Sequence, residues 1–240
     1  MSTAPVSVNA DDRLGDVALR SPSAARVLEK LGFDYCCGGK KSLAAACADR
    51  GLDVPVVLEA LSAVEETAPP VDPGAMELDR LIYHVLDTHH VYTREAFERL
   101  LPLAHKVRNR HGSTHAVVLR IADLVEDLHA DLMPHLMKEE QVLFPYALAR
   151  IAGRETRMPL GASAGPIACM QHEHTAAGEI LFAIREATNN FVPPAEACAS
   201  WRALYQGLDE LVHDVMQHIA VENEVLFPRI LAMDSVGRPA

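Results

Sequence analysis

The sequence predicts an all-α protein in which a small helical domain precedes an antiparallel four-helix bundle. Three observations lead to this class. Apolar residues recur at helical spacing in four long stretches of the later part of the chain. No segment shows the alternation of apolar and polar residues that a half-buried strand has. A proline-rich stretch separates the four long stretches from the residues before them, as a linker between two folded parts would.

The first part with folded character runs from Leu14 to Glu66 and contains three short helical segments. Each has a start or stop signal, such as a serine N-cap, a proline in the first turn or a glycine just past the end. The first helix starts at Ser21-Pro22 and stops at Gly32, the second runs from about Ser42 to Arg50 before Gly51, and the third starts near Pro55. The turn between the first two reads Asp-Tyr-Cys-Cys-Gly-Gly, at residues 34–39.

The stretch at residues 67–74 reads Thr-Ala-Pro-Pro-Val-Asp-Pro-Gly. Three prolines and a glycine in eight residues disfavour both helix and strand. We therefore predict three parts: a small helical N-terminal domain with the D-Y-C-C-G-G motif at residues 1–66, a Pro-rich linker at 67–75, and the helical bundle at 76–240.

The four long helices of the expected bundle follow this linker. Their expected ranges are Met76–Val107, Thr114–Ile151, Pro166–Thr188 and Pro194–Ala232. Ser113 or Thr114 is expected to cap the second helix, and Pro193-Pro194 to open the fourth. Helices joined by modest loops make antiparallel neighbours, and the core of such a bundle is a common place for metal sites.

The second and fourth helices carry an internal repeat. Asp127–Pro145 and Glu210–Pro228 are identical at nine of nineteen positions when they are aligned with an offset of 83. Both copies contain His-x-x-x-Glu, and both end in Val-Leu-Phe-Pro. Residues four apart lie on one helix face, about 6 Å apart along the axis, so the imidazole and the carboxylate can reach one metal ion or bridge two.

The first and third helices should complete this site. The third offers His172 and His174, and the first offers His84, His89 and His90. His174 precedes its repeat histidine by 44 residues and His90 precedes its own by 45, so a duplicated helix pair selects these two. The predicted metal ligands are His90, His135, Glu139, His174, His218 and Glu222.

Four imidazoles and two carboxylates are too many ligands for one tetrahedral zinc ion. They suit two ions joined by bridging carboxylates, as in di-iron bundles, with a coordination position left open. Imidazole and carboxylate also bind manganese and zinc, so iron is favoured but not required by the donor set.

Asp131 and Asp214 each lie one turn before a repeat histidine. Because helical side chains lean toward the N-terminus, we expect these aspartates to accept hydrogen bonds from the ligand rings; the alternative is that they are solvated. Pro134 is expected to kink the second helix. His84 and His172 are candidates for supporting or access-channel groups, whereas a structural or surface role is expected for the remaining histidines, His105, His111, His115, His129 and His213.

Charge and composition exclude several classes of function. The formal net charge of −11 argues against nucleic acid and anionic membranes as partners. No apolar run reaches the roughly 18 residues of a membrane span, and the first residues do not form a secretory signal. The five cysteines show no spacing typical of a disulfide framework, so we expect a cytoplasmic protein.

At its repeat the chain resembles the hemerythrin-like proteins, which are non-haem di-iron four-helix bundles. When further motifs are added to the repeat, the chain resembles the RIC ("repair of iron centres") family of di-iron proteins from about Leu14 to Leu231. These motifs are D-Y-C-C-G-G-K at 34–40, M-K-E-E-Q-x-L-F-P at 137–145, T-N-N at 188–190 and P-P-A-E-A-C at 193–198. The resemblance implies the same six ligands, with Glu139 and Glu222 bridging two iron ions that also share an oxo or hydroxo group. The fifth histidine ligand of hemerythrins has no obvious counterpart, which implies more open irons.

The resemblance implies a protein that helps repair iron–sulfur clusters damaged by nitrosative or oxidative stress. Three mechanisms stay open. The centre supplies iron to damaged iron–sulfur proteins, with Cys36 and Cys37 in a transfer or redox role; or it binds nitric oxide or dioxygen as a scavenger, carrier or sensor; or it reduces nitric oxide with an electron donor. The adjacent cysteines favour transfer, so a repair or binding protein is expected rather than a turnover enzyme; their alternative role is a structural turn with small buried thiols. A homodimer is compatible with the small N-terminal unit.

Overall fold

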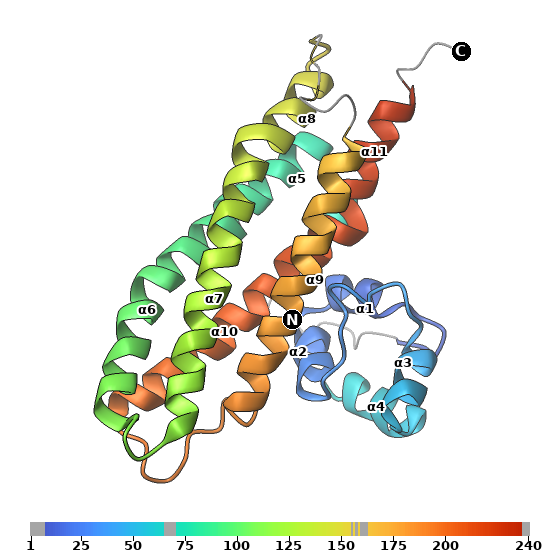
Figure 1. Ribbon diagram of the computed structural model, residues 1–240. Coiled ribbons are helices and arrows are strands. Elements are labelled where there is room, and N and C mark those ends of the chain that lie inside the picture. Colours follow the sequence, from blue (N-terminus) through green and yellow to red (C-terminus); the bar gives the residue numbers. More distant parts are fainter. Residues whose placement is uncertain (1–7, 65–70, 155, 157, 159–162, 237–240) are drawn as a thin grey trace, which may run out of the picture. The chain divides into compact units, whose positions relative to one another are not determined.

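The computed structural model describes residues 8–64, 71–154, 156, 158 and 163–236 (Figure 1). The described residues form helices and turns without a β-strand, so the all-α prediction is confirmed. No helix among them is both long and apolar enough to cross a lipid bilayer. They divide into two compact units: the residues up to Glu77 together with Met216–Arg229, and Leu78–Val215 together with the residues from Ile230 on.

The first unit begins with four short helices, and the three predicted ones are confirmed. The helices are α1 (Leu14–Arg20), which the sequence analysis missed, α2 (Pro22–Lys30), α3 (Leu43–Arg50) and α4 (Val54–Ser62). The Ser21 side chain caps α2 by accepting the Ala24 N–H at 2.8 Å. Gly51 follows α3 with a φ of +65°, a conformation that glycine adopts without strain.

The core of the first unit is built from apolar side chains of these helices and of the turn after α2. α2 packs against α1 and α4, and α4 also packs against α3. The fully buried side chains include Val17, Leu28, Phe33, Leu43 and Leu61. The predicted linker is described only from Val71 on, where Pro73–Ala75 form a short 3₁₀ turn, η1.

The remaining helices form the four long runs of the expected bundle. They are α5 (Leu78–His84), η2 (Val85–His90) and α6 (Val91–His111); α7 (Ala116–Lys138), η3 (Glu139–Leu143) and α8 (Phe144–Ile151); α9 (Ala164–Ala187); and α10 (Ala199–Val221), η4 (Glu222–Leu226) and α11 (Phe227–Val236). α7 packs against both α6 and α9, as Figure 1 shows. α10 approaches α6 closely at Gly207, where an added Cβ would lie 2.6 Å from Leu100 Cδ2.

Two predicted helix starts are wrong. The residue that precedes α7 is His115, without a side-chain cap, while the Thr114 hydroxyl donates to the carbonyl of His111. α10 starts at Ala199 rather than at Pro194. Two turns precede α10 instead of helix. In the first, Asn189–Phe191 have positive φ, and in the second the Ala197 N–H donates to the Pro194 carbonyl at 3.0 Å.

Three π-helical segments, η2, η3 and η4, interrupt the long runs, and the sequence analysis did not predict them. In η3 the Phe144 N–H donates to the carbonyl of Glu139, and in η4 the Phe227 N–H donates to that of Glu222, five residues back. The next residue in each copy is proline, Pro145 or Pro228, which has no N–H for the regular ladder. Such bulges are frequent at functional sites, and two of these begin at a predicted ligand.

Candidate metal centre

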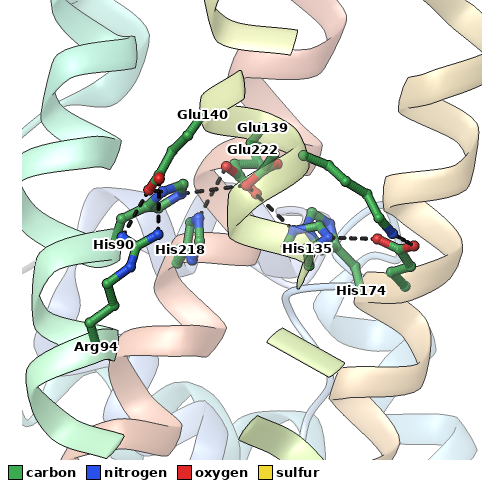
Figure 2. Close-up of polar contacts among 10 residues, drawn as sticks. His90, Arg94, His135, Glu139, Glu140, His174, His218 and Glu222 are labelled. Carbon is green, nitrogen blue, oxygen red and sulfur yellow. Dashed lines mark hydrogen bonds and ion pairs between the residues drawn. The ribbon is translucent and has the colours of Figure 1, made fainter. Parts of the chain in front are cut away.

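The structure brings the six predicted ligand side chains together in two groups of four. One group contains His90 and His218, the other contains His135 and His174, and both contain Glu139 and Glu222. Within each group, one donor atom from every residue lies within 4.8 Å of the others. Figure 2 shows the two carboxylates between the two pairs of imidazoles.

Each long helical run contributes to this cluster. His90 ends η2, His135 lies on α7, His174 on α9 and His218 on α10, while Glu139 and Glu222 are the first residues of η3 and η4. All six side chains are buried, with at most 2% of their surface exposed. Buried carboxylates are costly unless a cation or hydrogen-bond donors compensate them, so this donor set is arranged for a positively charged ligand.

The distances between the donor atoms fit metal coordination. His135 Nε2 lies 3.0 Å from His174 Nε2. Glu139 Oε2 lies 3.4 Å from His90 Nε2 and 3.5 Å from His135 Nε2, and His218 Nε2 lies 3.0 Å from Glu222 Oε1. Donors bound to one ion at about 2.1 Å lie about 3.0 Å apart in octahedral and about 3.4 Å apart in tetrahedral geometry. The residues present therefore fit a metal site.

Two further carboxylates orient the imidazoles from outside the cluster. His90 Nδ1 lies 2.8 Å from Glu140 Oε1, and His135 Nδ1 lies 2.9 Å from Glu173 Oε2. A hydrogen bond from Nδ1 to a carboxylate leaves the Nε2 lone pair directed into the cluster. Glu140 also pairs with Arg94, and Glu173 with Lys138.

The charges around these outer carboxylates keep both ionised. Burial alone would raise the pKa of Glu140 and that of Glu173. The hydrogen bonds from Arg94 and His90 outweigh burial at Glu140, and those from Lys138 and His135 outweigh it at Glu173, so both pKa values lie below the usual glutamate range. An ionised acceptor strengthens the hydrogen bond from a metal-binding imidazole.

The prediction that Asp131 supports His135 is wrong. Asp131 is exposed, and Glu173 on the neighbouring helix α9 occupies the hydrogen-bonding position on His135 Nδ1. Asp214 Oδ1 lies 3.0 Å from His89 Nδ1, and its expected contact with His218 stays a prediction. The sequence analysis missed Glu140 and Glu173; the available signal was that each directly adjoins a predicted ligand in the sequence.

The other histidines are distributed over the surface and the ends of the helices. His84 is half-buried, with its Nδ1 3.2 Å from the Thr88 hydroxyl, and burial, with a smaller effect of the charge of His89, lowers its pKa. His172 is exposed. The histidines assigned to structural or surface roles pair with Glu126 (His105), Cys198 (His111) and Glu196 (His115), and the ring of His129 contacts Phe97.

The predicted cysteine pair lies apart from these helices in sequence, in the turn between α2 and α3. Cys36 is buried and Cys37 is half-buried. Their sulfur atoms are 3.7 Å apart, so the two thiols are adjacent but not joined in a disulfide.

The fold and the cluster define the class of this protein: a helical bundle whose buried His/Glu cluster fits a metal site. Residues 81–230 match the family described as Hemerythrin HHE cation binding domain. Residues 10–65 match ScdA_N, described as a domain of unknown function, DUF542. The chain belongs to the hemerythrin HHE family, as the resemblance predicted.

Relatives that share both parts are similar over nearly their whole length. The chain is 40% identical over 222 residues to a protein of Cronobacter sakazakii named Iron-sulfur cluster repair protein YtfE, covering 92% of this chain and 97% of the relative. It is also 40% identical over 223 residues to proteins of the same name from Escherichia coli and Escherichia fergusonii, with the same coverage. These relatives contain counterparts of both the N-terminal domain and the bundle.

Proposed function

We propose that this protein is a cytoplasmic di-iron protein that helps repair iron–sulfur clusters damaged by nitrosative or oxidative stress. The observation that carries the proposal is the sharing of Glu139 and Glu222 by two groups of donor atoms. Shared carboxylates between two histidine pairs are typical of two ions bridged by glutamates. Relatives that match both parts of the chain are named for iron–sulfur cluster repair.

In this proposal His90 and His218 would hold one iron, His135 and His174 would hold the other, and Glu139 and Glu222 would serve both. Iron in such a site supplies ligand exchange and redox chemistry, including release to an acceptor and the binding of nitric oxide. With two imidazoles and two shared carboxylates for each ion, the chain itself supplies fewer than six donors, so positions stay open to small ligands.

The surrounding residues adjust how firmly the ions are held. Glu140 and Glu173 keep His90 and His135 in the tautomer that can bind metal. Both glutamates are only partly buried, so water and protons reach them from the surface. Because their pKa values are lowered, both glutamates stay ionised at neutral pH and keep their hydrogen bonds to the imidazoles.

Metal analysis and cluster repair test this proposal together. Protein purified without oxygen should contain two irons per chain, and it should restore the activity of a dehydratase whose [4Fe–4S] cluster was damaged by nitric oxide. Glu139→Ala removes a shared donor and should lower iron below two per chain with loss of repair. Glu98→Ala, at an exposed glutamate of α6, is the matched control and should change neither.

Other outcomes would favour the other two functions. A stable nitrosyl complex without any restoration of damaged clusters would contradict repair and support a nitric oxide carrier or sensor. Repeated consumption of nitric oxide with an added electron donor would instead make the protein a nitric oxide reductase. Two irons per chain in Glu139→Ala would show that the ligand set is wrong.

A further inference from the structure

A second cluster of metal-binding side chains lies in the first unit, in the turn that carries the D-Y-C-C-G-G motif. Asp34, Cys36 and Cys37 each offer one donor atom, and these atoms lie within 4.8 Å of one another. Cys36 Sγ is 3.7 Å from Cys37 Sγ and 3.4 Å from Asp34 Oδ1. The same carboxylate oxygen accepts the Cys37 N–H at 2.9 Å, which fixes the carboxylate against the two thiols.

These distances match those expected around one ion. Two thiolate sulfurs bound to a tetrahedral ion at about 2.3 Å lie about 3.8 Å apart, and such a sulfur lies about 3.6 Å from a carboxylate oxygen bound at about 2.1 Å. The observed separations of 3.7 and 3.4 Å differ little from these values. Two thiolates and one carboxylate fill three positions and leave the fourth for an exchangeable ligand.

The glycines that follow the cysteines hold this arrangement. A Cβ atom on Gly38 would lie 2.7 Å from the carbonyl oxygen of Asp34, and one on Gly39 would lie 2.5 Å from that of Tyr35. Any larger residue would push the turn open and separate the donor atoms. These close approaches explain why the motif ends in two glycines.

The proposed donor group can be reached from one side. Asp34 lines a cavity of about 300 Å³ with Gly38 and Lys41, so an ion can approach from the carboxylate side. Three protein donors leave the fourth tetrahedral position for a ligand that exchanges with solvent.

The turn is hydrogen-bonded to the segment that contains His218 and Glu222 of the His/Glu cluster. Asn223 Nδ2 donates to the carbonyl of Cys36 at 2.9 Å, and Gln217 Nε2 donates to the Tyr35 hydroxyl at 3.1 Å. In the sequence, Asn223 follows Glu222 directly, and Gln217 precedes His218 directly. Two hydrogen bonds therefore join the turn to residues that adjoin the cluster ligands His218 and Glu222 in the sequence.

We propose that Asp34, Cys36 and Cys37 form a second metal site, which binds one exchangeable ferrous ion. Binding forms two iron–sulfur bonds and one iron–oxygen bond and releases two thiol protons to solvent, while the iron stays ferrous. This role rests on the proposed function: the ion is iron in transit between the His/Glu cluster and an acceptor. Thiolate donors suit this role because they also bind iron in the clusters to be repaired.

Cobalt(II) tests the site separately from repair, because its thiolate complexes have a charge-transfer absorption that histidine and carboxylate complexes lack. Iron-loaded full-length protein titrated with cobalt(II) without oxygen should develop this absorption with one equivalent. Cys36→Ser/Cys37→Ser should abolish it, and Asp34→Asn should weaken binding at least about tenfold. Cys169→Ser/Cys198→Ser, at two exposed cysteines, is the matched control and should retain it.

No thiolate absorption in the unaltered protein, or its persistence in Cys36→Ser/Cys37→Ser, would overturn the site. Far-ultraviolet circular dichroism of each variant must equal that of the unaltered protein, and Asp34→Asn, which keeps both thiols, provides the second measurement. For transit, iron transfer to a ferrous chelator should be slower in Cys36→Ser/Cys37→Ser; an equal rate would overturn that role. Cobalt binding without cluster repair would contradict only the proposed function, and repair without cobalt binding would contradict only this site.

Discussion

Replacing Glu139 by glutamine should have opposite effects on the metal-free and the metal-loaded protein. Glu139 and Glu222 are both fully buried, and their donor oxygens lie within 4.8 Å of each other. At an effective dielectric constant of 20, two unit charges 4.8 Å apart repel by about 3.5 kcal/mol. The imidazoles of His90 and His135, at 3.4 and 3.5 Å from Glu139 Oε2, offset part of this repulsion, so the change should stabilise metal-free protein by about 1–3 kcal/mol.

In the loaded protein the same change removes a shared ligand. An ion present at a thousandfold excess over its Kd stabilises the folded state by about 4 kcal/mol, so loss of one ion would lower stability by up to that amount. Glu139→Gln should therefore lower the melting temperature of iron-loaded protein while it raises that of protein treated with a chelator. The amide has nearly the shape of the carboxylate, so the change of sign reports charge and not packing.

The assay is thermal unfolding of both forms, with iron counted before each measurement. Glu140→Gln is the control, because Arg94 and His90 hold the pKa of Glu140 below its usual range despite burial. Its ionised form stabilises the fold at neutral pH, so its loss should destabilise the metal-free protein by about 0.5–1 kcal/mol after solvent screening. Equal destabilisation of both forms by Glu139→Gln would refute the reasoning and make Glu139 a structural hydrogen-bond acceptor.

Three more changes test the fold. Gly39→Ala places a Cβ 2.5 Å from the Tyr35 carbonyl and should destabilise the first unit by about 2–3 kcal/mol in thermal unfolding. Gly51→Ala, where the space around the added Cβ is open, should cost about 1 kcal/mol. Equal losses in the two variants would contradict the close approach at Gly39. Ser21→Ala removes the cap of α2 and should lower the free energy of unfolding by about 1 kcal/mol; no change in urea unfolding would mean that the cap is redundant. Burial opposes ionisation of Asp234, but hydrogen bonds from Ser163 and Tyr146 hold its pKa below the usual value. The ionised Asp234 therefore stabilises the folded protein above about pH 4, and this stabilisation is lost as the pH falls through the lowered pKa of the folded state. Asp234→Asn should lower the free energy of unfolding by about 1 kcal/mol at pH 7 and should not change it near pH 2. A loss of stability that does not depend on pH would contradict this prediction.

The predicted cluster residues and the observed groups agree because the decisive information is local. His-x-x-x-Glu places both donors on one helix face regardless of the tertiary structure, and the internal repeat indicates which helices form equivalent pairs. The predicted contact of Asp131 is wrong because spacing within one helix does not determine which residue of a neighbouring helix reaches His135. The partner of His135 is Glu173 on α9, and contacts between helices depend on how they are rotated against each other.

The helix starts show the same limit. Ser21-Pro22 began a helix as predicted, since a cap and a proline act within one turn. Pro194 did not, because it lies in a turn, where its carbonyl accepts the Ala197 N–H at 3.0 Å, and α10 begins only at Ala199. A proline pair alone does not distinguish a helix start from the end of a loop.

The sequence by itself determined the all-α class, the four long helical runs and the six residues that the structure gathers in two groups, because helical periodicity and the His-x-x-x-Glu repeat act over a few residues. Only the tertiary structure decided which outer carboxylates orient the imidazoles and that η3 and η4 begin at the shared glutamates. It also decided that Asp34 joins Cys36 and Cys37, in a turn held by Asn223 from far along the chain. These features depend on contacts between distant residues, whose geometry is set by packing and not by spacing.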